Sequence, residues 1–228
     1  MDEKKEHEAI NPGLLQVCTR WSSEMRVLSE NHARVAYMES ELPKLLADTE
    51  VFTEILTGIA DTMNYPGIRT PTMFDTEIVL YRDPDRIFSV RMYLWGPGDY
   101  DPIHDHNSWG VIGSVSGGLD VINYKRLDKD RAEIHAEIVE FSREVIPPGR
   151  TYTVMPLEEG IHRTGNPGLY TIIQVGVYGE NLTGRRYIHL FHESDGRVVR
   201  LYSPQVKKQL LAREALRLLG ENSRTPAD

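Results

Sequence analysis

Residues 94–118 read LWGPGDYDPIHDHNSWGVIGSVSGG, and this stretch sets the pattern for the chain. A Gly/Pro-rich turn leads into Ile103–His106, and an apolar run follows from Gly110. Side chains at positions i and i+2 of an extended strand point to the same face. His104 and His106 therefore aim two imidazoles at one point, as a metal ion with open coordination positions requires. A third ligand must come from elsewhere in the chain.

Short segments with strand-like composition, separated by turn signals, fill the chain from about residue 70. The expected strands are Glu77–Tyr81, Ile87–Trp95, Ile103–His106, Gly110–Val115, Leu119–Lys125, Glu137–Phe141, Glu144–Ile146, Thr151–Met155, Tyr170–Tyr178, Tyr187–Phe191 and Val198–Tyr202. Turns such as Pro97-Gly98, Gly117-Gly118 and Asn166-Pro167-Gly168 lie between them. Many short strands at close spacing predict a sandwich or barrel, jelly rolls included.

Helical periodicity flanks the strand region on both sides. Asn11 and Pro12 read as an N-cap and a first helical residue, and apolar spacing continues in segments as far as Ile59, with Pro43 as a kink or boundary. Gln205–Leu219 reads as a basic amphipathic helix. We expect one domain, with a helical segment at 1–68 packed on a barrel at 69–204, and a helix and tail at 205–228.

Composition narrows the class of protein. The chain has 228 residues, 40% of them hydrophobic and 26% charged, which is typical of a soluble globular protein. A net charge of −8 argues against nucleic acid as a partner, and no apolar run approaches the roughly 20 residues of a membrane span. The charged start, MDEKKEHEAI, is unlike a signal peptide, and Cys18 is the single cysteine. We expect a cytoplasmic monomer or homodimer with a small-molecule substrate.

The third histidine of the site is expected at His162. Of the other histidines, His7 and His32 lie in the helical part, His135 lies in a charged hairpin, and His189 and His192 do not share a strand face. His162 has strands on both sides and follows the turn Pro147-Pro148-Gly149 and a strand. In a barrel with this order of strands, the segment that carries His162 would lie beside the strand that carries His104 and His106.

The order Gly98, His104-x-His106, Gly117, Pro148-Gly149 and His162 resembles the two motifs of the cupin superfamily. This resemblance implies a mainly β fold, the cupin double-stranded β-helix (jelly-roll barrel), here with an N-terminal helical segment and a C-terminal helix. The first cupin motif usually carries a glutamate about four residues after its second histidine, where this chain has Gly110. The site would then be three neutral imidazoles, which suit iron, zinc, copper or nickel alike. A divalent metal in such a site would keep its charge of +2, because no carboxylate neutralises it, and this charge favours an anionic ligand such as a thiolate or hydroxide.

A narrower resemblance is carried by two blocks. The first contains Phe88-Ser89-Val90, Trp95-Gly96-Pro97-Gly98, Pro102-x-His104-Asp105-His106, Trp109-Gly110 and Gly113, and the second contains His162 and Val177-Tyr178-Gly179-x-Asn181-Leu182. Together they resemble the cysteine dioxygenase-like thiol dioxygenases, closest to the bacterial branch that acts on 3-mercaptopropionate. The resemblance implies a mononuclear non-haem Fe²⁺ enzyme with His104, His106 and His162 as iron ligands. It implies a small thiol and O2 as substrates and a sulfinic acid as product.

The chain departs from that family on the strand after the third ligand. The family usually has Ser-x-His-x-Tyr there, and this chain has Gln174-x-Gly176-x-Tyr178. Tyr178 keeps the catalytic hydroxyl that the resemblance implies, but Gln174 or another residue would have to replace the lost histidine as its support. The cysteine that some members cross-link to this tyrosine is Val111 here.

Substrate contacts are also implied by the resemblance. An arginine that binds a substrate carboxylate is expected a few residues beyond Asn181, which makes Arg186 the candidate and Arg185 the alternative. Trp109 would form part of the wall of the iron site, and Gln174 would face the substrate. Asp105 would point away from the metal if its neighbours point in.

Two other functions stay open at the level of sequence. Loss of the Ser-His pair leaves room for a cupin oxygenase whose substrate is not a thiol. A metal-binding cupin module without turnover is the third reading.

Overall fold

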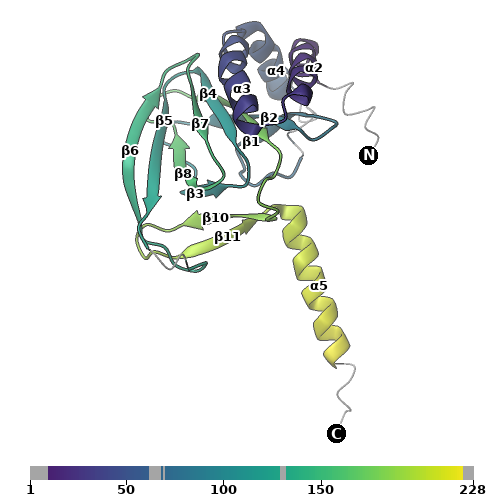
Figure 1. Cartoon of the computed structure of the whole chain (residues 1–228), viewed down its shortest axis with the longest axis vertical. Coiled ribbons are helices and arrows are strands. Elements are labelled where there is room, and N and C mark those ends of the chain that lie inside the picture. The colour runs from purple at the N-terminus through teal and green to yellow at the C-terminus, as the bar shows by residue number, and fades with distance from the viewer. Residues whose placement is uncertain (1–9, 62–67, 69, 129–131, 223–228) are drawn as a thin grey trace.

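Two antiparallel β-sheets face each other in the computed structural model, which describes residues 10–61, 68, 70–128 and 132–222 (Figure 1). The first sheet has the order β1 (Glu77–Arg82), β2 (Phe88–Trp95), β9 (Ile172–Gly179), β4 (Gly110–Ser116) and β7 (Thr151–Val154). The second has the order β11 (Val198–Tyr202), β10 (Tyr187–Phe191), β3 (His104–His106), β8 (Leu157–Gly165), β5 (Leu119–Arg126) and β6 (Ile138–Ile146). From β2 to β10 the chain passes repeatedly from one sheet to the other, which is the jelly-roll arrangement. The predicted fold class is confirmed.

Three helices cover the outer face of the first sheet: α2 (Pro12–Val27), α3 (Asn31–Leu46) and α4 (Thr49–Asp61) (Figure 1). The predicted N-cap is confirmed, because the Asn11 side chain accepts a hydrogen bond from the Leu14 amide. Pro43 lies inside the last turn of α3. Residues 1–9, with His7, and residues 223–228 of the expected tail lie outside the described ranges.

Strand alternation decides which side chains face the helices and which face the barrel interior. On β2, Val90 and Met92 join the core under the helices, while Tyr93 and Trp95 join a second cluster between the sheets. The same alternation on β9 puts Val177 under the helices and Tyr178 in the interior. The barrel interior is apolar at one end and carries the polar side chains described below at the other.

One strand, β8, is absent from the strands expected from the sequence. Its residues, LEEGIHRTG, mix glutamates and glycines with few apolar side chains, so its local pattern does not indicate a strand. It also begins irregularly, because Leu157 has a φ of +64°. A Cβ at Gly160 would lie 2.0 Å from the Met155 carbonyl oxygen, so the chain needs glycine at this close approach. His162 therefore lies within a strand, which corrects its expected place in a segment between two strands.

The last helix, α5 (Pro204–Asn222), begins just after β11 and extends away from the barrel (Figure 1). It exposes several leucines, among them Leu211, Leu216 and Leu219. In the described part of the chain, no helix combines the length and the apolar character that crossing a membrane would take.

The end of β8 is fastened to the end of β2 by a buried side chain. Asn166 Nδ2 lies 2.9 Å from the Trp95 carbonyl oxygen, 3.0 Å from that of Gly96 and 2.8 Å from that of Tyr170. Its Oδ1 accepts a hydrogen bond from the Gly168 amide at 2.8 Å. This one amide therefore holds the turn after β8 against the WGPG segment that leads toward β3.

We expect Asn166→Ala to lower the free energy of unfolding by about 2–3 kcal/mol, since buried carbonyl oxygens lose their donor. Urea denaturation followed by circular dichroism measures the change. Asn31→Ala is the matched control, because Asn31 Oδ1 is buried without a hydrogen-bond partner among the described residues. Its expected change is within about 0.5 kcal/mol. Equal losses in both variants would contradict the role of Asn166.

Candidate metal centre

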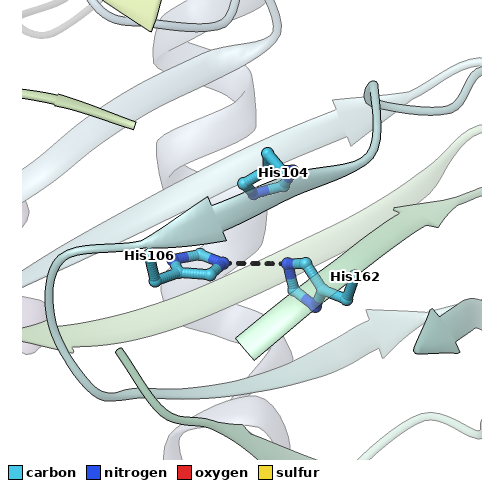
Figure 2. Close-up of side chains that lie close together, drawn as sticks. All are labelled: His104, His106 and His162. Atoms are coloured by element: carbon cyan, nitrogen blue, oxygen red, sulfur yellow. Dashed lines mark hydrogen bonds between the residues drawn. The ribbon is translucent and has the colours of Figure 1, made fainter. Parts of the chain in front are cut away.

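Three histidines meet at the junction of β3 and β8. His104 lies directly opposite His162 in the antiparallel register, and His106 follows two residues later on β3. Their ligand atoms all lie within 4.8 Å of one another, and Nε2 of His106 is 2.9 Å from Nε2 of His162 (Figure 2). The expected triad is thus brought together, and it could hold a metal ion.

Contacts behind the rings orient two of these imidazoles. His104 Nδ1 is 2.9 Å from the Pro102 carbonyl oxygen, an acceptor that places the proton on Nδ1 and leaves Nε2 for a metal. His162 Nδ1 is 3.4 Å from the Tyr152 hydroxyl. Asp101 stands behind His104, with Oδ2 3.8 Å from Nδ1, and is itself fixed by Thr164.

The donor chemistry of the triad suits a transition metal. Burial lowers the pKa of His106 and of His162, and the neighbouring histidines lower both further. Both rings are therefore neutral at ordinary pH and carry a lone pair for coordination. Three imidazole nitrogens fit iron, zinc, copper or nickel and do not fit the oxygen preference of magnesium or calcium.

Tyr178 fills the space beside the triad. Its ring is nearly parallel to that of His106, with centroids 5.9 Å apart and an interplanar angle of 13°. A Cβ at Gly110 would lie 2.8 Å from Tyr178 Cδ1, and a Cβ at Gly176 would lie 2.6 Å from Tyr178 Cε2. Larger residues at either position would force the ring to move. The tyrosine ring thus lies over the backbone at the position where a cupin glutamate would stand.

Two residues of β2 support Tyr178 in place of the missing histidine. The Tyr93 hydroxyl donates a hydrogen bond to the Tyr178 hydroxyl, and the Arg91 guanidinium lies 5.3 Å from the centre of its ring. Burial raises the pKa of Tyr178, so the phenol stays protonated at ordinary pH. Because Tyr178 accepts from Tyr93, its own hydrogen can donate to a bound molecule.

Gln174 and Trp109 have different positions from those expected. Gln174 lines the cavity, but its Oε1 accepts from Trp95 Nε1 at 2.9 Å, so this amide supports Trp95 rather than Tyr178. Trp109 lies in the core under the helices, against Gly179, and does not line the cavity. Neighbouring residues of an extended chain face opposite sides, so the inward Gly110 turns Trp109 outward. This corrects its expected place in the wall of the site.

Arg185 is held by a buried network that the sequence analysis does not identify. Its Nη2 lies 3.0 Å from Asp105 Oδ2, and its Nε lies 3.0 Å from Asn107 Oδ1. Asp105 also accepts from the His189 amide at 2.7 Å and lies 3.0 Å from His189 Nδ1. The expected outward direction of Asp105 is therefore observed. Asp105 neutralises the charge of Arg185.

Arg186 also lines the cavity, but it makes a different contact. Its Nη2 donates to Gln209 Oε1 of α5 at 2.8 Å, in exposed surroundings. Whether either arginine binds a substrate carboxylate stays a prediction. The geometry shows Arg185 already paired and Arg186 tied to the base of the last helix.

The cavity has a volume of about 310 Å³ and opens onto His104 and His106. Glu77 and Arg91, from neighbouring strands, also line it. The inward position of Arg91 could have been predicted from the alternation of side chains along β2. Val90 and Met92 face the helices, so Arg91 between them must face the barrel interior.

No family model matches the chain. Solved structures to which it is similar include a Cupin 2 conserved barrel domain protein from Salinispora arenicola, at 14% identity over 50% of this chain and 84% of that chain, with a TM-score of 0.36. A cupin superfamily protein from Desulfitobacterium hafniense is 10% identical over 46% of this chain and 75% of that chain, with a TM-score of 0.33. A protein with a double-stranded β-helix domain from Klebsiella pneumoniae is 17% identical over 55% of this chain and 87% of that chain, with a TM-score of 0.35. None of these similarities bears on the chemistry of this chain.

We expect the purified protein to bind about one equivalent of a divalent transition metal, and His162→Ala to lose most of it. Removal of one of three ligands takes away both a bond and the convergence that β8 provides. Metal content after dialysis, measured by inductively coupled plasma mass spectrometry, tests this. His32→Ala is the control, because His32 is exposed on α3. Full metal retention in His162→Ala would contradict the triad.

Proposed function

We propose that the protein is a mononuclear non-haem iron oxygenase that converts a small thiol to a sulfinic acid with O2. The observation that carries this proposal is the cluster of three histidines with the Tyr178 phenol beside it. The motif resemblance to the thiol dioxygenases supports the same reaction. A ligand set without a carboxylate leaves the full +2 charge of ferrous iron to attract a thiolate.

The overall reaction is RSH + O2 → RSO2H. Both oxygen atoms end on sulfur, so no separate reductant is required. When bound, ferrous iron would supply the redox chemistry and the positive charge that lowers the pKa of the thiol. His104, His106 and His162 would hold it through Nε2, with the Pro102 carbonyl fixing the first ring.

The other residues of the cavity bind and orient. The Tyr178 hydroxyl donates a hydrogen bond toward a molecule bound beside His106, and Tyr93 keeps that hydroxyl in place. Trp95, through Gln174, fixes the inner wall of the cavity. The apolar cluster between the sheets, which includes Ile112 and Val154, limits the access of water to the cavity from inside the barrel.

The decisive experiment is O2 uptake by the iron-loaded protein with a panel of small thiols and non-thiol acids. We expect thiol-dependent uptake with a sulfinate product seen by mass spectrometry, and none with the zinc-loaded protein, because zinc has no redox chemistry. Uptake with a non-thiol acid instead would favour another cupin oxygenase. Iron binding without any uptake would favour a metal-binding module.

We expect Tyr178→Phe to lower kcat by about 10-fold to 100-fold, the range seen when a hydrogen-bonding residue close to a metal site is removed. Steady-state oxygen consumption measures the rate, and metal content should be unchanged. Tyr170→Phe is the control, since Tyr170 is 83% exposed. An unchanged rate in Tyr178→Phe would remove the role assigned to the hydroxyl.

A further inference from the structure

Glu77 and Arg91 form an ion pair in the wall of the cavity, where β1 pairs with β2. Glu77 Oε1 lies 2.5 Å from Arg91 Nη1, and the Glu77 side chain is 1% exposed. Arg91 is more open, at 29% exposure, and both residues line the cavity. The Tyr178 ring contacts both Arg91 and His106, so the ion pair lies close to the metal ligands.

The second oxygen of this carboxylate lacks a donor. Glu77 Oε2 is buried and has no hydrogen-bond partner among the described residues. Leaving a buried charged acceptor unpaired is unfavourable, because the oxygen has given up its hydrogen bonds to water without gaining others. A donor supplied by a bound molecule in the cavity would satisfy it.

The charges around the cavity indicate what kind of donor this is. Arg91 is balanced by Glu77, and Arg185 is balanced by Asp105. A substrate carboxylate therefore finds a compensated guanidinium at both places, and only Arg186, which is bonded to the neutral Gln209, lines the cavity without a carboxylate contact among the described residues. A substrate ammonium finds the unpaired Glu77 Oε2, with three N–H donors to offer.

We propose that Glu77 is a specificity residue that binds a primary ammonium, and that the substrate is an aliphatic aminothiol. This inference rests on the proposed function. The ammonium donates to Glu77 Oε2 while the thiolate is directed toward the three histidines. Arg91 holds Glu77 in place through Oε1 and leaves the second oxygen free to accept.

The test compares thiols of similar length that differ in their second group: 2-aminoethanethiol, 2-mercaptoethanol and 3-mercaptopropionate. With the iron-loaded wild-type protein, we expect the highest kcat/KM for 2-aminoethanethiol. Glu77→Gln should lower that value about 10-fold to 100-fold, mainly through KM, because a charged hydrogen bond is lost. It should change kcat/KM for 2-mercaptoethanol by no more than about 2-fold, because this thiol has no ammonium. It should also raise kcat/KM for 3-mercaptopropionate, since Arg91 loses its counter-charge.

Glu41→Gln is the matched control. Glu41 is also a buried carboxylate, 8% exposed in its side chain and paired with Arg20 and Lys44, but it lies on α3 away from the cavity. We expect the Glu41→Gln variant to select among the three thiols as the wild-type protein does. A fall of the same size for all three thiols in Glu77→Gln would show a structural role and overturn the inference.

A second measurement separates this inference from the proposed function. Calorimetry with the zinc-loaded protein, which does not turn over, should show tighter binding of 2-aminoethanethiol than of 2-mercaptoethanol, with the difference lost in Glu77→Gln. If no thiol supports O2 uptake, the proposed function fails and this binding difference still tests Glu77. If Glu77→Gln does not fold, equal wild-type affinities for the two thiols overturn the inference.

Discussion

The pairing of His104 with His162 across β3 and β8 is the constraint on which the site depends. Because side chains alternate along a strand, a slip of one residue between these strands would turn His162 to the other face of the sheet. The register is held from both sides. Asp101, before β3, accepts from the amide and hydroxyl of Thr164 on β8, at 2.6 Å and 3.0 Å. Asn166 ties the end of β8 to the segment after β2. The three histidines are therefore placed by backbone pairing that neighbouring polar contacts fix.

Tyr178 explains two departures from the expected motifs at once. Its ring lies over Gly110 on β4 and over Gly176 on its own strand, so neither position has room for a Cβ without a shift of the ring. A glutamate at 110 and a histidine at 176 are thus excluded by the same side chain. The hydrogen bond that such a histidine would supply comes instead from Tyr93 of β2, which lies opposite Gln174 in the register of the two strands. The two departures from the family motifs are therefore linked, because a larger side chain at either glycine would displace the same tyrosine ring.

Local pattern in the sequence was enough for part of this arrangement. His104 and His106 could be placed on one face from spacing alone, and the many short strands indicated a jelly roll. β8 could not be predicted, because its glutamates and glycines carry no strand periodicity and its pairing comes from β3 and β5. The support of Tyr178 by Tyr93 could not be predicted either. It depends on the register between β2 and β9 and on how the Tyr178 ring lies over Gly176, and that register is a long-range property that no local pattern reveals.

The balance of charges in the cavity changes how the arginines are to be understood. An arginine near a substrate site suggests an anion clamp, but a guanidinium already bonded to a carboxylate adds little net potential. Asp105 takes up the charge of Arg185, and Glu77 takes up that of Arg91. A metal bound by the three histidines would then add positive charge to a cavity in which Arg186, bonded to the neutral Gln209, is the other cation without a carboxylate contact among the described residues. On the proposed function, an anionic group such as a thiolate would be directed to that metal rather than to Arg91 or Arg185. Selectivity for the rest of the substrate falls to the atoms that remain unpaired, and the buried Oε2 of Glu77 is the acidic one among them.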